Sequence, residues 1–287
     1  MGRIAYVNGQ FVRHGQAVVH IEDRGYQLAD AVYEVWALFG GKLADPEGHF
    51  ARLERSLGEL RIPMPMSREA LTIVLREAVR QNRVSEGLVY LQVGRGVATR
   101  SHAFPDQPVP PSIVITVSAI DRVASEAKAA KGVKVITTPE NRWGRCDIKT
   151  VGLLPNALAK QAAKERGAAE AWFVDELGFV TEGSSSNAWI VDAEGTLRTR
   201  DTNANILRGV TRYTLLDVLR EEGVKVDERP FTPAEAVAAK EAFITGAGSL
   251  VLPVIAVDDK PVGDGVVGPV AMKLRRLYIE RARATAI

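Results

Sequence analysis

The chain has 287 residues, of which 46% are hydrophobic and 25% are charged, so it can fill the cores of two ordinary domains. Its 37 basic and 35 acidic residues leave a net charge of +2, and nucleic acid or an anionic membrane surface is therefore not an expected partner. The single cysteine, Cys146, excludes an internal disulfide and suits a reducing compartment.

The N-terminal residues contain no apolar signal core, and the longest apolar stretches, 112–120 and 249–257, are about half of the ~20 residues that a membrane helix needs. We therefore expect a cytoplasmic protein without a membrane segment.

The first 120 residues predict a mixture of strands and helices. Asn8-Gly9 between two β-rich runs is typical of a two-residue hairpin turn, and Ser67 is a good N-cap for a helix. In chain order, the expected elements are strands over 4–7, 10–12 and 32–38, helices over about 46–60 and from 68 onwards, and strands over 88–93 and 113–120.

The second half also alternates between strands and helices. Segment 121–132 is polar and rich in Lys and Ala, and we expect it to connect two domains. Thr232-Pro-Ala-Glu235 has the pattern of a capping box. The expected elements are strands over 133–137, 171–174, 179–181, 187–191, 197–200 and 242–245, and helices over 155–166, 210–222, from 233, and 269–283.

Lys149 lies in the run Arg145-Cys-Asp-Ile-Lys149, just ahead of an expected helix. Burial or a cationic neighbour such as Arg145 favours the neutral form of a lysine amine, and a neutral amine can form a Schiff base with an aldehyde cofactor. From the local sequence alone, a surface lysine is an equally good interpretation.

Glu182 lies in the run Thr181-Glu-Gly-Ser-Ser-Ser-Asn187, between two strand-like segments. A pyridinium nitrogen requires such a carboxylate, and a phosphate requires such amides and hydroxyls. Without Lys149, an ordinary turn glutamate would be the preferred interpretation.

Five sequence blocks together resemble the D-amino acid aminotransferases, which belong to the fold-type-IV group of pyridoxal-phosphate enzymes. The blocks span nearly the whole chain in the same order. They are Glu22-Asp-Arg-Gly-Tyr-Gln27 with Asp30-Ala-Val-Tyr-Glu34, Arg95-Gly96 with Arg100-Ser-His102, Arg145-Cys-Asp-Ile-Lys149, Thr181-Glu-Gly-Ser-Ser-Ser-Asn187, and Ile206-Leu-Arg-Gly-Val-Thr-Arg212.

The resemblance implies a mixed α/β chain with two domains. The smaller N-terminal α/β domain would cover 1–120, the connection 121–132, and a larger cofactor-binding domain with a barrel-like β core 133–287.

The resemblance also assigns residues to pyridoxal 5′-phosphate. Lys149 would form the Schiff base and move the proton, and Glu182 would pair with the pyridine nitrogen. The remaining cofactor-binding residues would be Arg52, Val210 and Thr211 at the phosphate, Leu207 on the ring face, and Ala247 in a second phosphate loop. The family commonly has a hydroxyl residue at the position of Ala247, so we expect weaker phosphate binding there unless Thr245 or Ser249 compensates.

The substrate carboxylate would be bound by Arg100 and His102, with the Tyr33 hydroxyl as a third donor. In the family this Arg and His come from the neighbouring subunit, which implies a homodimer. Other positions with chemistry, namely His14, His20, His49 and Cys146, are interpreted as structural.

The expected activity is ping-pong transamination from a D-amino acid such as D-alanine to a 2-oxo acid such as 2-oxoglutarate. The alternatives are a branched-chain L-amino acid aminotransferase, an aminodeoxychorismate-type lyase, an (R)-amine transaminase and a cofactor-holding protein without turnover. The Arg100-x-His102 pattern favours the first, since an (R)-amine transaminase would have lost it.

Overall fold

The computed structural model describes residues 2–203 and 205–287, and the chain divides into two compact units. Unit 1 contains Met1–Asp121, Ile148–Gly152 and Thr285–Ile287, and unit 2 contains Arg122–Asp147 and Leu153–Ala284. Segment 121–132, expected to connect two domains, instead forms helix α4 (Arg122–Lys131) of unit 2. Ala, Glu and Lys are strong helix formers, and Ala129 is fully buried, so this polar run packs as a helix.

Unit 1 is built on a six-stranded antiparallel sheet with the order β2-β1-β6-β5-β3-β4. Its strands are β1 (Ile4–Val7), β2 (Gln10–Arg13), β3 (Ala31–Phe39), β4 (Lys42–Leu43), β5 (Gly87–Gly94) and β6 (Ser112–Ala119). Asn8 and Gly9 form the predicted hairpin turn, with φ values of 46° and 96°. This sequence favours positive φ at both turn positions.

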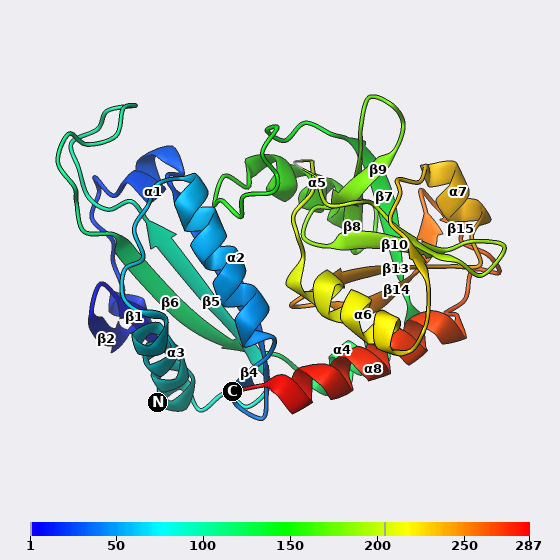
Figure 1. Cartoon of the computed structure of the whole chain (residues 1–287), viewed down its shortest axis with the longest axis horizontal. Helices are drawn as coiled ribbons and strands as arrows, with labels where there is room; N and C mark the ends of the chain where they lie inside the picture. Colours follow the sequence, from blue (N-terminus) through cyan, green and yellow to red (C-terminus); the bar gives the residue numbers. More distant parts are fainter. Residues whose placement is uncertain (1, 204) are drawn as a thin grey trace. The chain divides into compact units, whose positions relative to one another are not determined.

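Two long helices, α2 (Pro46–Glu59) and α3 (Arg68–Asn82), cover one face of this sheet (Figure 1). Ser67 accepts a hydrogen bond from the Ala70 N–H, which confirms the predicted N-cap. The core joins Phe50, Leu53 and Leu57 of α2 and Leu71 and Leu75 of α3 to the inward side chains of β3, β5 and β6. Two shorter helices, η1 (His14–Gln16) and α1 (Arg24–Leu28), lie in the N-terminal segment.

Unit 2 contains a curled nine-stranded mixed sheet with the order β12-β11-β10-β13-β14-β7-β8-β9, and β15 pairs with β14. Its strands are β7 (Val133–Pro139), β8 (Glu170–Val174), β9 (Val180–Gly183), β10 (Asn187–Val191), β11 (Leu197–Thr199), β12 (Val226–Asp227), β13 (Glu241–Gly246), β14 (Leu250–Val257) and β15 (Lys260–Pro261). The predicted fold class, mixed α/β with a barrel-like β core, is confirmed.

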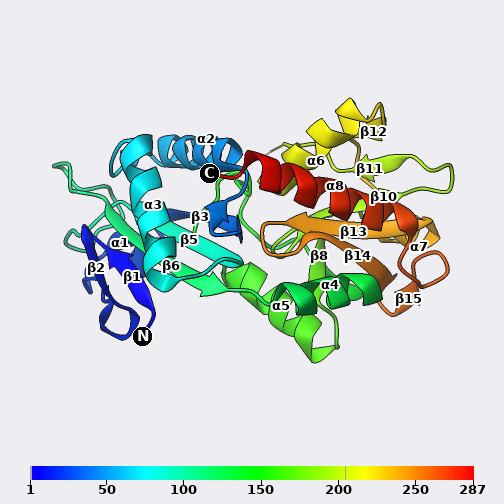
Figure 2. The same cartoon turned by 90° about the horizontal axis from the view of Figure 1, so that it is seen from below.

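The remaining helices of unit 2 are α5 (Leu154–Glu165), α6 (Val210–Glu221), α7 (Pro233–Ala238) and α8 (Pro269–Thr285). Helices α6 and α8 lie side by side (Figures 1 and 2), and ion pairs join Lys273 to Glu222 and Arg281 to Glu221. Thr232 and Glu235 form the predicted capping box of α7. Among the described helices, none combines the length and the apolar character required to cross a membrane.

Candidate active site

Lys149 belongs to unit 1 because its backbone extends the edge of strand β3. The Tyr33 N–H donates to the Lys149 carbonyl oxygen at 3.0 Å, and Val32 and Thr150 form an antiparallel bridge. Strand β4 pairs with β3 only at Leu38 and Phe39, near the end of β3. The first residues of β3 therefore pair with residues 149–151 along this edge. The ammonium nitrogen of Lys149 then lies 4.0 Å from the centroid of the Tyr33 ring.

Arg52, predicted to bind phosphate, is anchored by a fully buried carboxylate. Its Nε and Nη2 atoms donate to the two Glu34 carboxylate oxygens at 2.7 and 2.8 Å. His49 Nδ1 lies 2.7 Å from the same carboxylate. Burial alone would raise the pKa of Glu34, but the charge and hydrogen bonds of Arg52, helped by His49, hold this pKa at about 2. Glu34 is therefore ionised and fixes the guanidinium in a planar, two-bond geometry.

His49 was interpreted as structural, and its contacts agree with that interpretation. Burial lowers its pKa despite the hydrogen bond to Glu34, so the imidazole is neutral at neutral pH. Its ring centroid lies 5.2 Å from that of Trp36.

One turn after Arg52, the Ser56 hydroxyl accepts a hydrogen bond from the Lys149 N–H at 3.4 Å. Since positions four apart share a helix face, α2 presents Arg52 and Ser56 on the same side.

Arg100 and His102 lie on the long loop between β5 and β6, and both are exposed. Two buried arginines brace this loop from inside unit 1. Arg24 Nη1 donates to the carbonyl oxygens of Ser101 and Ala103 at 2.7 and 3.2 Å. Arg95 stacks on the Phe104 ring at 3.6 Å from its centroid. The backbone that carries Arg100 and His102 is thus fixed on both sides of His102.

Asp30 connects the two bracing arginines. Its carboxylate accepts from Arg24 Nε at 2.7 Å and from Arg95 Nε and Nη2 at 2.7 and 2.9 Å. Burial alone would raise the pKa of Asp30, but the hydrogen bonds and charges of Arg95 and Arg24 lower it. One carboxylate therefore partly balances two buried cations, and backbone carbonyl groups accept further hydrogen bonds from both arginines.

Glu182 lies on β9 in unit 2, and only 4% of it is exposed. Its carboxylate accepts hydrogen bonds from Arg142 Nη1 at 2.6 Å, Asn187 Nδ2 at 3.0 Å and the Leu207 N–H at 3.1 Å. All three partners are donors, which stabilises the ionised carboxylate. This donor set fits a buried counter-ion for a protonated ring nitrogen, because it favours the ionised carboxylate that such a nitrogen requires.

Leu207 and the start of α6 are connected to this carboxylate through Asn187. Asn187 Nδ2 also donates to the Leu207 carbonyl oxygen at 3.0 Å. Gly209 is the N-cap of α6, and a Cβ atom there would lie 1.9 Å from Asn187 Oδ1. Only glycine fits this approach, so Asn187 fixes both the Glu182 carboxylate and the start of the helix.

Val210 and Thr211 form the first turn of α6 and are buried. Gly209 contributes no side-chain cap to this 12-residue helix. The first N–H groups of a helix and its positive dipole end favour an anion, and a phosphate is well suited to them. The donor types at this turn therefore fit a phosphate group.

Ala247 lies in the turn between β13 and β14, where the family commonly has a hydroxyl residue. Each of the two side chains expected to compensate has one contact within unit 2. Thr245 Oγ1 accepts from Trp189 Nε1 at 3.0 Å, and Ser249 Oγ lies 3.5 Å from the Gly246 carbonyl oxygen. Because Thr245 Oγ1 accepts in its contact, its O–H can still donate, as can the backbone N–H groups of this turn.

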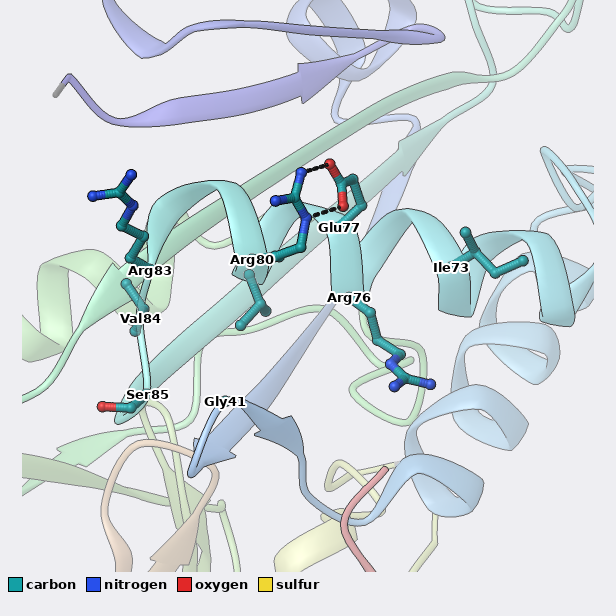
Figure 3. A pocket seen from close by; sticks show the side chains of 9 residues that line it. Gly41, Ile73, Arg76, Glu77, Arg80, Arg83, Val84 and Ser85 are labelled. Atoms are coloured by element: carbon teal, nitrogen blue, oxygen red, sulfur yellow. Dashed lines mark hydrogen bonds and ion pairs between the residues drawn. The ribbon is translucent and has the colours of Figure 1, made fainter.

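A cavity of about 730 Å³ lies elsewhere in unit 1, beside the C-terminal half of α3. None of the predicted site residues lines it. Its three arginines do not converge: Arg80 pairs with Glu77, whereas Arg76 and Arg83 point in different directions (Figure 3). This cavity therefore does not form a common anion site and is distinct from the candidate active-site residues.

Arg145 and Cys146 have local partners. Arg145 was expected to act on Lys149, but its guanidinium pairs with Asp147 at 2.9 Å. The Cys146 thiol donates to the Trp143 carbonyl oxygen at 3.1 Å. Burial raises the pKa of this thiol to about 11, so it is neutral at physiological pH, which agrees with a structural role.

The sequence analysis did not identify Glu34, Asp30, Arg142 or Asn187 as partners of site residues. Each of them lies inside or next to one of the five sequence blocks. Their pairing depends on the fold, because Arg142 and Glu182 are 40 residues apart in the chain. For Asp30 and Glu34, the available signal was a charged residue within a block that had no predicted role.

Residues 31–257 match the family model described as amino-transferase class IV. The chain is 36% identical over 279 residues to a D-alanine aminotransferase of Staphylococcus haemolyticus, covering 96% of this chain and 97% of the relative. It is 38% identical over 275 residues to a D-alanine aminotransferase of Listeria monocytogenes serotype 4b, covering 96% and 94%.

Solved branched-chain amino acid aminotransferases have the same fold. The Escherichia coli structure has a TM-score of 0.88 at 22% identity, covering 98% of this chain and 95% of that chain. A T.th. structure with pyridoxamine 5′-phosphate has a TM-score of 0.88 at 26% identity, covering 98% and 94%.

Proposed function

The chain belongs to the class IV aminotransferase family, and we propose that it transfers the amino group of a D-amino acid such as D-alanine to a 2-oxo acid such as 2-oxoglutarate. The family reaction is transamination with pyridoxal 5′-phosphate. The observation that carries the proposed D-specificity is the braced loop with Arg100 and His102, together with full-length relatives described as D-alanine aminotransferases.

Pyridoxal phosphate, when bound, supplies an aldehyde that accepts the amino group and a ring that withdraws electrons from the substrate Cα. Lys149 would hold the aldehyde carbon between half-reactions and carry the proton to and from the substrate Cα. Its backbone hydrogen bonds to β3 and α2 fix the position from which its side chain extends. General acid–base transfer of this kind typically contributes about 10²–10⁴-fold to a rate.

Glu182 would keep the ring nitrogen protonated, because its carboxylate is buried and accepts three hydrogen bonds that favour its ionised form. Leu207, whose N–H donates to that carboxylate, would pack against the ring face. The phosphate would be bound by Arg52, by the first turn of α6 with Val210 and Thr211, and by the backbone around Ala247. These positions combine a fixed guanidinium with helix amides.

The substrate carboxylate would be bound by Arg100 and His102, with the Tyr33 hydroxyl as a third donor. The bracing of the loop by Arg24 and Arg95 lowers the cost of ordering these two side chains on binding. Because the Cα–H bond must face Lys149, the side on which the carboxylate binds selects the hand of the substrate.

The proposed enzyme is a homodimer in which Arg100 and His102 complete the site of the partner subunit. Both side chains are exposed in the single chain. Large apolar side chains are also exposed on the same loop and on the neighbouring N-terminal segment, namely Val18, Ile21, Tyr26, Val97 and Phe104, and such surface is typical of an interface. We also place the enzyme in the cytoplasm, where Cys146 would stay reduced.

A branched-chain L-amino acid aminotransferase is the second candidate, because the T.th. structure at 26% identity belongs to an enzyme described as a branched-chain amino acid aminotransferase. Steady-state assays with 2-oxoglutarate separate the two. The proposal expects turnover with D-alanine and little or none with L-leucine. Turnover with L-leucine alone would assign the chain to the second class, and sedimentation at assay concentration would test the dimer.

A further inference from the structure

Arg142 is the closest charged neighbour of Glu182 and has no role in the function proposed above. Its Nη1 atom donates to Glu182 Oε1 at 2.6 Å, and only 7% of its side chain is exposed. Its planar group also lies over the Phe173 ring, with 4.4 Å between the guanidinium carbon and the ring centroid. Its Nη2 atom also lies 3.4 Å from Thr181 Oγ1 and 3.3 Å from the Asn205 carbonyl oxygen.

Glu140 neutralises Arg142 from the other side. It accepts from Arg142 Nε at 2.8 Å and Nη2 at 2.6 Å, a two-bond pair, and also from the Thr181 hydroxyl at 2.7 Å. Burial favours the neutral form of Glu140, but the hydrogen bonds and charge of Arg142 lower its pKa. For Arg142, the contacts with Glu140 and the charge of Glu182 outweigh burial and raise its pKa. Glu140 and Arg142 are therefore charged, and the three donors to Glu182 favour its ionised form.

The cluster of Glu140, Arg142 and Glu182 carries one net negative charge. Neutral groups also lie against it, among them the Asn187 amide, the Leu207 N–H, the Thr181 hydroxyl and the Cys146 thiol. One protonated pyridine ring balances this charge, so a cluster with cofactor would be electrically neutral. A buried arrangement of this kind is favourable only when charges are matched and hydrogen-bonded.

We propose that Arg142, with Glu140 as its counter-ion, is a positioning residue that holds Glu182 as an oriented anion and thereby keeps the proton on the cofactor ring nitrogen. This inference rests on the function proposed above, in which Glu182 faces that nitrogen. A hydrogen bond to the charged form of a carboxylate weakens its affinity for a proton. The negative charge of Glu140 offsets the positive charge of the Arg142 guanidinium. The hydrogen bond from Arg142 to Glu182 therefore adds no net positive charge that would lower the pKa of the ring nitrogen.

The test uses the full-length holoprotein reconstituted with pyridoxal phosphate labelled with ¹⁵N in the ring. The ¹⁵N chemical shift reports directly whether the ring nitrogen carries a proton, and it requires no turnover. Wild type is expected to show the protonated position at pH 7.5. Arg142→Gln is made together with Glu140→Gln, so that the net charge of the cluster stays at minus one. In this Arg142→Gln protein the shift should move towards the unprotonated position. The half-titration pH of the ring nitrogen should fall by about one unit or more, since each pH unit is a tenfold change in protonation.

Two further variants keep this test informative. Arg142→Lys retains the charge but lacks the planar fork, so it should give an intermediate shift if orientation contributes. Arg200→Gln removes another buried arginine of unit 2, which pairs with Asp175 at 2.8 Å, and should leave the ring ¹⁵N shift unchanged. Circular dichroism of each variant checks folding, and Arg142→Lys carries the test if Arg142→Gln does not fold.

A wild-type ¹⁵N shift in both Arg142 variants would overturn the inference. The same shift change in Arg200→Gln as in Arg142→Gln would also overturn it, because the effect would then be a general loss of packing. Absence of D-alanine turnover in wild type would instead contradict the proposed function. The NMR result would still be decided in that case, since it depends only on bound cofactor.

Discussion

The ammonium nitrogen of Lys149 lies 4.0 Å from the centroid of the Tyr33 ring, and the carbonyl oxygen of Lys149 accepts the Tyr33 N–H at 3.0 Å. Two contacts between the same residues, one through the backbone and one through the side chains, fix the lysine against strand β3.

Lys149→Ala should abolish transamination while leaving the fold intact. Loss of acid–base transfer alone lowers a rate by about 10²–10⁴-fold, and the covalent attachment is lost as well. Turnover of D-alanine with 2-oxoglutarate measures the effect. Lys164→Ala, at an exposed lysine of α5, is the matched control and should retain full turnover. Undiminished turnover of Lys149→Ala would remove this residue from the mechanism.

Arg100→Ala should weaken D-alanine binding by about 2–4 kcal/mol if its carboxylate contact is desolvated. The change should appear mainly in KM, because the Lys149 and Glu182 groups stay in place. Arg76→Ala removes another exposed arginine of unit 1 and should leave KM unchanged. An unaltered KM in Arg100→Ala would show that this loop does not bind the substrate carboxylate.

Asp30→Asn should loosen the loop that carries Arg100 and His102, since Asp30 fixes both bracing arginines. The expected results are a higher KM for D-alanine, unchanged affinity for pyridoxal phosphate and faster tryptic cleavage after Arg100. Asp106→Asn changes an exposed aspartate of the same loop and controls for the altered charge. Equal cleavage rates in wild type and Asp30→Asn would contradict this account of the bracing.

Glu34 should make the free energy of unfolding fall as the pH is lowered into the acid range. Its pKa is lowered from 4.5 to about 2 in the folded chain. Its contribution is therefore complete above pH 4.5 and is lost as the pH falls from 4.5 towards 2. A lowering of this size corresponds to about 3 kcal/mol.

Glu34→Gln should lower the free energy of unfolding at pH 7 by an amount of that order, and the difference from wild type should shrink below pH 4.5. Urea unfolding at a series of pH values measures it. Glu77, on the surface of α3, also has a pKa of about 2, but an exposed ion pair contributes little to stability. Glu77→Gln should thus change the unfolding free energy far less; equal losses would contradict the role of burial.

Ala247→Thr should strengthen binding of pyridoxal phosphate, because it restores a hydroxyl donor in the turn after β13. One additional hydrogen bond contributes about 1 kcal/mol, or roughly fivefold in affinity. Titration of the apoprotein measures the dissociation constant. Ala193→Thr, in an exposed turn of unit 2, should have no effect. Unchanged affinity in Ala247→Thr would mean that this turn does not contact the phosphate.

Periodicity and turn chemistry predicted most of the elements. The hairpin at Asn8-Gly9, the Ser67 N-cap and the capping box at Thr232 are set by local sequence, and all three are confirmed. Segment 121–132 was interpreted as a connection because it is polar, although residues 122–131 favour and form a helix. Residues 250–257 were noted only as apolar and form strand β14, whose pairing with β13 and β7 is long-range.

The candidate site was predictable in its residue types but not in its partners. Lys149 and Glu182 were identified from blocks of sequence, whereas the buried carboxylate of Glu34 and the half-buried carboxylate of Glu140 were not. Nothing local shows that Glu34 points inward or that Arg142 pairs with Glu182, because both depend on which strands and helices face each other. Ion-pair networks of this kind are therefore properties of the fold.

The half-reaction without a 2-oxo acid tests the central claim most directly. Protein loaded with pyridoxal phosphate would be mixed separately with D-alanine, L-alanine and L-leucine, and the absorption of the cofactor and the oxo acid released would both be measured. The account predicts conversion to the pyridoxamine form by D-alanine only, with one pyruvate released per bound cofactor. Conversion by L-leucine or L-alanine but not by D-alanine would contradict it.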